Sequence, residues 1–448
     1  MLDQMFTAEN FRRIFDIENR KGLDVASRFF PQIEPHTKAA KDKVQEIREL
    51  RSKEPALKPE LFAQLLNAAK DELKKLKAAK STAVDQALEQ VSLVIEKSSF
   101  KIVLEQKQGP GGKPIYCIDG SPETFFVVKQ LQRNLNRIYG VKQANRHDLV
   151  CQVRDTLRGT FPFELIRTDI TSFYESVDPT KLFEKLDRDR LLSPSSRRFI
   201  KQILTSYQSA SGSHLGIPRG VGISAYLAEL YLRSVDREIK GIAGSVIYCR
   251  YVDDIVAIFA KPPTGSSSIS YKDMIIEILE RHGLAHNPKK TAAIFPTTSS
   301  GVKFQYLGYR FLLTGSYCKI SPSGSKIAKY RFKLKAAFKD YHQTVSFNSV
   351  KAYRTLVARV KFLTGNARLL NSKSSAVTGI YYNNSLANST SSFGALDKLL
   401  KREIEKTKRK KLKKRLKLYG FQKGFDERRF HNFSSRELRN IVEVWKHG

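Results

Sequence analysis

The stretch "YCRYVDDIVAIF", residues 248–259, places two adjacent aspartates, Asp253 and Asp254, inside an otherwise apolar and β-branched run. The flanking segments "SVIYCRY" and "IVAIF" predict two strands that are joined at the aspartates. Neighbouring carboxylates repel each other, and burial of either one without a partner is costly. The pair therefore either lies on an exposed turn or holds a cation.

A third carboxylate, Asp169, ends another strand-like run, "FELIRT". If these strands are neighbours in one sheet, the three carboxylates converge. Oxygen ligands without His or Cys suit Mg²⁺ or Mn²⁺, and two such ions about 4 Å apart support in-line phosphoryl transfer. The alternative is that all three aspartates are ordinary hairpin-turn residues.

The charge balance of the chain indicates its class of partner. The 448 residues include 79 Lys and Arg against 44 Asp and Glu, a net charge of +35. Such an excess favours a polyanion, with nucleic acid first. A merely basic surface is the alternative, and a membrane surface is disfavoured because the aromatic residues are not gathered into an anchoring face.

The sequence also gives an expected location. No apolar stretch is long enough to span a bilayer, and the first residues, "MLDQMFTAENFRRIF", lack the plan of a secretory signal. The four cysteines, Cys117, Cys151, Cys249 and Cys318, have no metal-ligand spacing. We expect buried, reduced thiols and a cytoplasmic protein without a membrane.

Three segments follow from composition and periodicity. Residues 1–100 are expected to form a helical N-terminal extension, residues 101–320 an α/β segment, and residues 321–448 a basic helical region. Within the first segment, residues 59–80 and 81–97 predict two helices, with Ser81 as N-cap of the second.

The most basic run is "KREIEKTKRKKLKKRLKLYG", residues 401–420. Its apolar residues Ile404, Leu412 and Leu416 are spaced to form one packing face. We therefore expect a basic helix here and not a disordered tail, with a solvated charged helix as the alternative to a nucleic-acid contact.

Five segments together carry a resemblance to a known family. They occur in order within about residues 120–312 and resemble the successive palm motifs of reverse transcriptases, of the bacterial type related to retron and group II intron enzymes. The resemblance implies an α+β right-hand polymerase with fingers, an antiparallel palm sheet and a helical thumb, preceded by the N-terminal extension. The five segments are "RTDITSFYESVD" (167–178), "GIPRGVGISAYLAELYL" (216–232), "YCRYVDDI" (248–255), "GLAHNPKKT" (283–291) and "FQYLGY" (304–309).

The resemblance assigns catalytic roles to these positions. Asp169 and Asp253 would bind both of two Mg²⁺ ions, with Mn²⁺ as the alternative metal, and Asp254 would support the site less directly. Tyr174, five residues after Asp169, would lie under the sugar and reject a 2′-hydroxyl. The alternative for Tyr174 or its neighbour Phe173 is an ordinary core ring.

Further positions are implied to bind the nucleotide. Arg219 occupies the position of the glutamine in the family's "GLPQGSPIS" segment. This difference leaves open how the residue at this position would contact the template. Lys290 would lie near the triphosphate. In "RIYGVKQANRHDLV", residues 137–150, Arg146 first and Lys142 second would contact phosphate, since the planar guanidinium binds phosphate oxygens in a bidentate way. An ordinary surface side chain is the alternative for Lys290 and for Arg146.

The family's primer grip corresponds to Tyr306, Leu307 and Gly308, and its substrates would be an RNA template and dNTPs, with DNA as product. The segments "ENFRRIFDIENRKG" and "RVKFLTGNARLL…GIYYNNSL" resemble extensions of bacterial antiphage reverse transcriptases. That resemblance implies a structured noncoding RNA, a second reverse transcriptase subunit and a homo-oligomer as partners. The retron "VTG" occurs at residues 377–379, without the companion "NAxxH", which disfavours a standard retron enzyme.

Three other functions remain open. An RNA-dependent RNA polymerase is disfavoured by "YVDD" and Tyr174. A catalytically inactive RNA-binding or assembly module is disfavoured by the three intact aspartates. A template-independent nucleotidyltransferase is compatible with every motif.

Overall fold

The computed structural model describes residues 3–52, 58–109, 112–159, 161–261, 270–295, 302–314, 317–369 and 376–445. The chain divides into two compact units, each built from two segments. Unit 1 is Met1–Lys142 with Ser172–Leu232, and unit 2 is Gln143–Thr171 with Arg233–Gly448. The three-segment division made from the sequence remains a prediction. No helix among the described residues has the length and apolar character needed to cross a membrane.

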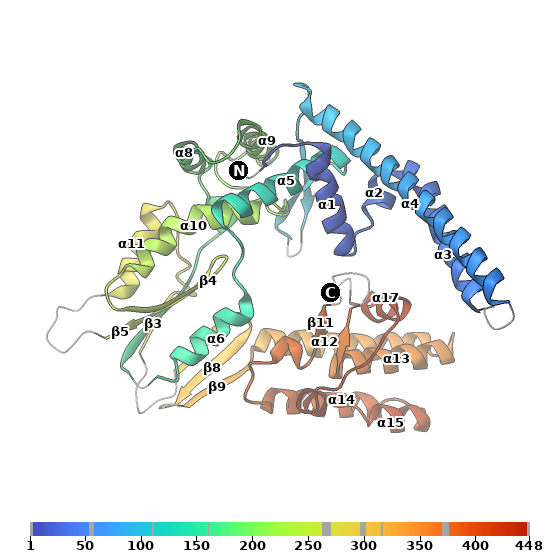
Figure 1. Ribbon diagram of the computed structural model, residues 1–448. Helices are drawn as coiled ribbons and strands as arrows, with labels where there is room; N and C mark the ends of the chain where they lie inside the picture. Colours follow the sequence, from blue (N-terminus) through green and yellow to red (C-terminus); the bar gives the residue numbers. More distant parts are fainter. Residues whose placement is uncertain are drawn as a thin grey trace. The chain divides into compact units, whose positions relative to one another are not determined.

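Unit 1 is mainly helical, with one small hairpin in which β1 pairs antiparallel to β2 (Figure 1). The elements of unit 1 are α1 (Ala8–Arg20), α2 (Val25–Phe29), the 3-10 helix η1 (Pro31–Ile33), α3 (Glu34–Ser52), α4 (Pro59–Glu96), β1 (Leu104–Gln108), β2 (Pro114–Ile118), α5 (Pro122–Tyr139), α7 (Phe173–Ser176), α8 (Pro179–Asp189), α9 (Pro194–Ser211) and the first half of α10 (Ser224–Lys240).

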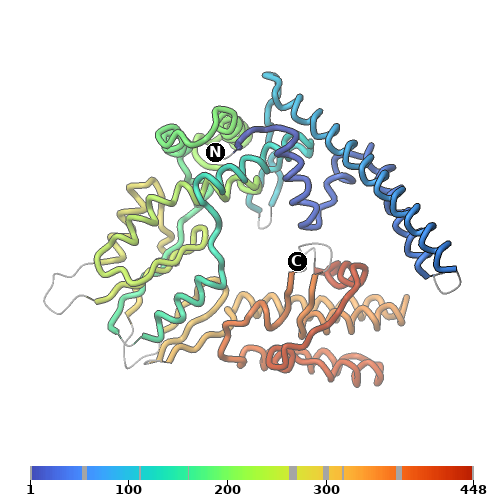
Figure 2. The backbone as a smooth tube through the Cα atoms, viewed as in Figure 1, coloured from blue at the N-terminus to red at the C-terminus, as the bar shows by residue number. Residues whose placement is uncertain are grey.

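The predicted helix boundary at Ser81 is wrong, because α4 is one helix of 38 residues that packs along α3 (Figure 2). Arg12 of α1 binds Ser81, donating from Nη2 to its Oγ at 3.1 Å and from Nη1 to its carbonyl at 3.3 Å. The Thr82 hydroxyl donates to the Ala78 carbonyl one turn earlier. Tertiary and local hydrogen bonds thus satisfy these hydroxyls without breaking the helix.

Unit 2 contains a four-stranded antiparallel sheet of order β4-β5-β3-β6 and a meander of order β7-β8-β9. The fold is thus α+β with antiparallel sheets, as predicted. The sheet elements and their neighbouring helices are α6 (Arg146–Thr156), β3 (Phe163–Asp169), β4 (Ser245–Tyr251), β5 (Asp254–Ala260), α11 (Tyr271–Arg281), β6 (Ala292–Ile294), β7 (Val302–Tyr306), β8 (Tyr309–Thr314) and β9 (Tyr317–Pro322).

The rest of unit 2 is a helical subdomain with its own apolar core. It includes the short pair β10–β11, in which the "VTG" residues form β11. Its elements are α12 (Gly324–Thr344), α13 (Ser349–Thr364), β10 (Asn366–Arg368), β11 (Val377–Gly379), the 3-10 helix η4 (Tyr382–Asn384), α14 (Ser391–Glu405), α15 (Lys410–Leu416), α16 (Phe421–Asp426) and α17 (Ser435–Glu443).

The basic run at 401–420 forms two helices, not the single one expected. Helix α14 ends at Glu405 and α15 begins at Lys410. Between them the Thr407 amide and hydroxyl both donate to the Ile404 carbonyl, which turns the chain. The predicted packing face is nevertheless confirmed, because Ile404, Leu412 and Leu416 are all fully or almost fully buried. The four cysteines are free thiols.

One glycine of the helical subdomain gives a stability prediction. A Cβ at Gly424 of α16 would lie 1.6 Å from the Thr364 carbonyl oxygen, so Gly424→Ala should push α16 away from α13 and destabilise the protein by about 3 kcal/mol. The control is Gly394→Ala in α14, where the nearest atom would be 3.9 Å away. That change should stabilise by about 0.5–1 kcal/mol. Denaturant unfolding compares them, and equal effects would contradict the packing described.

Candidate active site

The three aspartates predicted to converge lie at one edge of the four-stranded sheet. Strands β3 and β5 are antiparallel with Asp169 directly opposite Asp254, so the predicted adjacency of these strands is confirmed. Asp253 occupies the turn between β4 and β5, and its carbonyl accepts the Ile170 amide at 3.0 Å. The backbone register therefore brings all three carboxylates to the same end of the sheet.

The turn that carries Asp253 is unusual. Val252 has φ of 60°, a left-handed conformation that a β-branched residue rarely adopts. Its carbonyl accepts a hydrogen bond from Arg250 Nη1 at 3.0 Å. Strained backbone of this kind persists only where surrounding contacts fix it, and it concentrates at functional sites.

Arg250 is itself fixed by a bidentate ion pair. Its Nε and Nη2 lie 2.7 and 2.8 Å from the two carboxylate oxygens of Asp236 on α10, and Arg250 is only 8% exposed. The Tyr248 hydroxyl donates to the same carboxylate at 2.7 Å. Burial and the Asp236 charge raise the pKa of Tyr248, which keeps it a neutral donor. Asp236 therefore anchors the arginine that supports the turn.

The surroundings of Asp254 disfavour the charged form of its carboxylate. Burial raises the pKa of Asp254 to about 6, with smaller contributions from the charges of Asp169 and Asp253 that Arg167 partly offsets. Its Oδ1 is buried and makes no hydrogen bond within the described chain, the closest cation being Arg167 Nε at 3.9 Å. A carboxylate oxygen in this situation is stabilised by a nearby cation.

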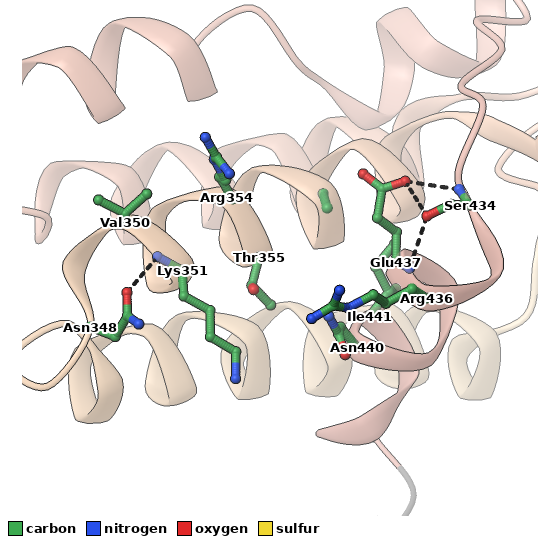
Figure 3. Close-up of a pocket in the computed structure, with 11 residues that line it drawn as sticks. Asn348, Val350, Lys351, Arg354, Thr355, Ser434, Arg436, Glu437, Asn440 and Ile441 are labelled. Carbon is green, nitrogen blue, oxygen red and sulfur yellow. Dashed lines mark hydrogen bonds between the residues drawn. The ribbon is translucent and has the colours of Figure 1, made fainter.

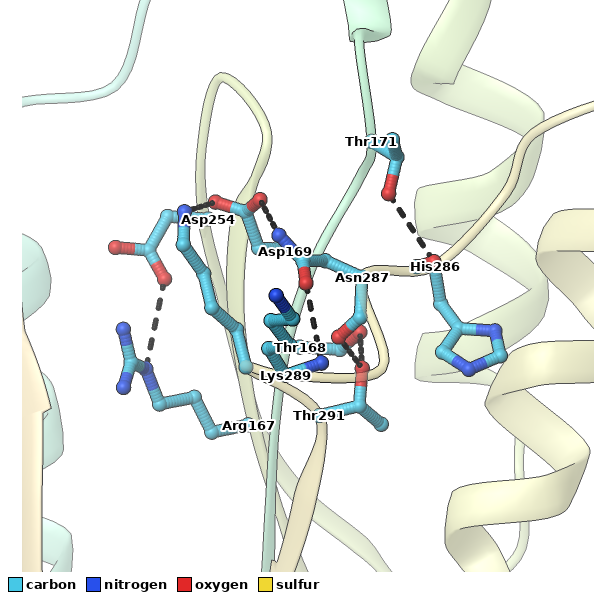
Figure 4. A network of polar contacts seen from close by, with 10 residues as sticks. Arg167, Thr168, Asp169, Thr171, Asp254, His286, Asn287, Lys289 and Thr291 are labelled. Carbon is cyan, nitrogen blue, oxygen red and sulfur yellow. Dashed lines mark hydrogen bonds and ion pairs between the residues drawn. The ribbon is translucent and has the colours of Figure 1, made fainter.

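Asp169 is held by donors from the segment "AHNPKKT". Lys290 Nζ lies 2.7 Å from Oδ2, and Asn287 Nδ2 lies 3.5 Å from Oδ1 (Figure 4). The Asn287 amide also donates to the Asp169 carbonyl at 2.8 Å. Lys290, which the resemblance places near the triphosphate, thus contacts the first aspartate in this conformation.

The oxygen ligands of the three aspartates fit a hard divalent cation. In this conformation, however, they are not yet arranged as a metal site. Among the described residues, no three His, Cys, Asp or Glu side chains are grouped closely enough to hold an ion. The buried, hydrogen-bond-free oxygen of Asp254 and its raised pKa are what a cation would relieve. Metal ligation by Asp169 Oδ2 requires that Lys290 leave it.

The predicted primer grip is the turn between β7 and β8. Leu307 and Gly308 have φ of 44° and 78°, and the Tyr306 hydroxyl donates to the Cys249 carbonyl of β4 at 3.2 Å. Arg146, predicted to contact phosphate, donates from Nε to the Leu307 carbonyl at 3.2 Å. Unit 2 therefore brings Arg146 to the primer-grip turn, a contact between residues 161 positions apart.

A cationic pocket of about 690 Å³ lies beside this turn. Five of its lining residues are basic or histidine, and the described lining residues include no Asp or Glu. Burial and, secondarily, Arg146 lower the pKa of Lys326 to about 8. An anion would relieve this concentrated charge. The five basic or histidine residues that line the pocket are Arg146, His147, Lys326, Lys329 and Lys333.

Sequence reasoning missed the lysines of this pocket. Lys326, Lys329 and Lys333 stand at helical spacing on α12 and so share one face. That periodicity within "SGSKIAKYRFKLK" was the available signal, because basic residues on one helix face mark an electrostatic footprint.

The remaining predicted site residues belong to unit 1. Arg219 Nη2 lies 2.9 and 3.1 Å from the carboxylate oxygens of Glu175, a partner that the sequence did not reveal. The same guanidinium lies 5.5 Å from the centre of the Tyr174 ring. The Ile217 amide donates to the Tyr174 carbonyl at 2.8 Å, which ties "SFYES" to "GIPRG". Lys142 is exposed after α5.

Comparison with known protein families gives a match to the middle of the chain. Residues 157–311 match the family model described as reverse transcriptase (RNA-dependent DNA polymerase). This range includes the three aspartates, Tyr174, Arg219 and Lys290. No curated protein is significantly similar to the chain.

Among solved structures, apo telomerase from Candida tropicalis, truncated from the C-terminal domain, aligns at 16% identity and a TM-score of 0.35. The alignment covers 50% of this chain and 54% of that one. The family match is the finding that bears on function: residues 157–311 are similar to the domain described as reverse transcriptase (RNA-dependent DNA polymerase).

Proposed function

We propose that the chain is a right-hand polymerase that copies RNA into DNA by two-metal phosphoryl transfer. The observation that carries this proposal is the register of Asp169 opposite Asp254, with Asp253 in the adjoining turn. Carboxylates at one sheet edge, inside a segment that matches reverse transcriptases, are the donor set that this chemistry needs.

The proposed reaction requires no nucleophile from the protein. The primer 3′-oxygen forms a bond to the α-phosphorus of a dNTP, and the bond from that phosphorus to the pyrophosphate oxygen breaks. Asp169 and Asp253 would hold two Mg²⁺, or Mn²⁺, and Asp254 would support them. When bound, the ions supply activation of the attacking oxygen and charge stabilisation at the leaving group.

The residues around the metal site position the substrates. Lys290, once displaced from Asp169, is available to the charge that develops on pyrophosphate. The cationic pocket beside Leu307 suits the phosphates of the primer–template duplex, so α12 would act as a thumb helix. Arg146, which lines this pocket, and Lys142 would contact phosphate, and Arg219 would contact the template or nucleotide.

Removal of divalent ions tests the metal assignment. Primer extension by the purified protein should fall by at least about a thousandfold in EDTA, since the aspartates alone cannot stabilise the transferring phosphoryl group. Excess Mg²⁺ or Mn²⁺ should restore it, whereas Ca²⁺ at the same concentration is the control and should not. Extension that persists in EDTA would contradict a two-metal mechanism.

Tyr174→Ala tests the proposed sugar gate. Loss of the ring removes the steric overlap with a 2′-hydroxyl, so the preference for dNTP over rNTP should fall by about tenfold or more. The ratio of kcat/KM for dGTP and GTP measures this. Tyr317→Ala is the matched control, since Tyr317 is 60% exposed on β9. Unchanged selectivity in Tyr174→Ala would remove Tyr174 from this role.

The biological setting is proposed from the resemblance of the terminal segments to antiphage reverse transcriptases. It comprises a structured noncoding RNA as template, a second reverse transcriptase subunit, a homo-oligomer and action in the cytoplasm. Sequencing of RNA that copurifies with the chain from cells carrying its native locus tests this setting. A single enriched noncoding RNA is expected, and a random sample of cellular RNA would contradict it.

A further inference from the structure

A second basic groove lies on α13, in the helical subdomain of unit 2. Helices α13 and α17 line a pocket of about 520 Å³ (Figure 3). A neighbouring pocket of about 470 Å³ shares Val350 and Arg354 with it and extends to the start of α15. We name the combined surface the α13 groove. Its basic residues are Lys351, Arg354, Arg409, Lys410, Lys411 and Arg436.

The positive charge of the α13 groove exceeds its negative charge, because six basic residues and one acid, Glu437, line it. In the described chain, Lys351, Arg354 and Arg436 form no ion pair with a carboxylate. Glu437, an acid that lines the groove, is engaged by the amide and hydroxyl of Ser434 at 2.8 and 2.9 Å, and these bonds lower the pKa of Glu437. Elsewhere on α15, by contrast, lysines do pair with Glu405. The net positive charge therefore favours an anionic ligand.

The groove is also rigidly built. Arg359 of α13, only 3% exposed, donates to the carbonyls of Asn440 and Ile441 at 3.0 and 3.3 Å and pairs with Asp340 of α12. These bonds join α17 to α13. Arg409 Nη1 approaches the Ser349 carbonyl at 3.5 Å, which joins α15 to the same helix. The basic side chains thus project from a fixed framework.

Two exposed apolar side chains belong to this surface or adjoin it in the chain: Val350 lines both pockets, and Phe347 precedes the lining residue Asn348. Phe347, in the turn before α13, is 90% exposed, and Val350 is 59% exposed. An aromatic ring beside a basic groove is the arrangement by which proteins stack unpaired bases while basic groups bind the backbone. A duplex offers no free base face in its interior, so this combination favours a single strand.

The α13 groove is distinct from the pocket beside the primer grip. The two share no lining residue, although both reach α13 and α17; the lysines of that pocket stand in the first half of α12. Helix α12 has 21 residues and is therefore about 30 Å long, and Phe347 follows its far end. We propose that the α13 groove binds an unpaired nucleic-acid strand, with phosphates on Lys351, Arg354 and Arg436 and a base on Phe347, separately from the duplex at the catalytic aspartates.

Binding in EDTA tests this site without any polymerase activity, so its outcome is independent of the proposed catalysis. The full chain is titrated against fluorescent, unstructured strands of about 20 nucleotides, one of RNA and one of DNA. The variant K351E/R354E/R436E should bind at least about tenfold more weakly, and its salt slope should fall by about 2, since each phosphate contact contributes about 0.7. The strand that the wild-type chain binds more tightly, RNA or DNA, is identified as the ligand.

The control K74E/K75E/K77E carries the same charge change on exposed or partly exposed positions of α4. It should weaken binding less than threefold or so, by long-range charge alone. Phe347→Ala, at a position that does not pack in the core, should weaken single-strand binding about fivefold without changing the salt slope.

Polymerase activity on a short preannealed primer–template should remain within about twofold of wild type in the groove variants, because the duplex pocket is intact. Three results would overturn the proposal: unchanged single-strand affinity in the triple variant, an equal loss in the α4 control, or a stronger effect on duplex than on single-strand binding.

Discussion

Asp253→Asn is expected to reduce dNTP incorporation by at least about a thousandfold, because it removes one charge and a bridging ligand from the proposed metal site. The carboxylate stands in a turn beside β5, next to Asp254 and one register position from Asp169. No neighbouring carboxylate can replace it without moving the sheet edge. Primer extension under single-turnover conditions measures the effect.

The matched control is Asp71→Asn on the exposed face of α4, which should retain full activity. Thermal unfolding should show that Asp253→Asn is as stable as wild type, since the change removes a charge that raises the pKa of Asp254. A variant that stays folded and keeps more than about a tenth of its activity would contradict the catalytic role.

The second large effect concerns stability. Asp236→Ala leaves the Arg250 guanidinium, which is 8% exposed, without its bidentate partner. Loss of one member of a buried pair typically costs about 3–5 kcal/mol, and denaturant unfolding should show a loss of this size. Incorporation by the protein that remains folded should also fall through kcat, because Arg250 supports the Val252 carbonyl beside Asp253.

Asp236→Ala/Arg250→Met is the control for this explanation. Removing both charges should recover a large part of the stability, since no uncompensated charge is then buried. The double variant should nevertheless remain poor in catalysis, because the hydrogen bond to Val252 is absent. Equal instability of the single and double variants would contradict the buried-charge explanation.

The fold was most predictable where the pattern was local and repetitive. The apolar runs "FELIRT" and "IVAIF" form β3 and β5, which are the two interior strands of the four-stranded sheet and pair with each other. The spacing of Ile404, Leu412 and Leu416 likewise identified a buried face. Ser81 misled the prediction, because a hydroxyl residue can cap a helix or, as here, bind Arg12 within one.

The candidate site was only partly predictable, since its ion pairs join residues far apart in the chain. Lys290 with Asp169 spans 121 positions and Arg219 with Glu175 spans 44. No local pattern specifies which carboxylate a lysine or arginine will meet. The support of Val252 by Arg250 was missed although the two residues are close in the chain, since it depends on the ion pair that Arg250 of β4 makes with Asp236 of α10.

The central claim, that the chain copies RNA into DNA, is tested most directly by sequencing its product. The purified protein is given Mg²⁺, a primer annealed to an RNA of arbitrary mixed sequence, and all four dNTPs or all four rNTPs. We expect a DNA strand complementary to the RNA and little product from rNTPs. An RNA product, a DNA product unrelated to the template, or no product from the folded protein would contradict it.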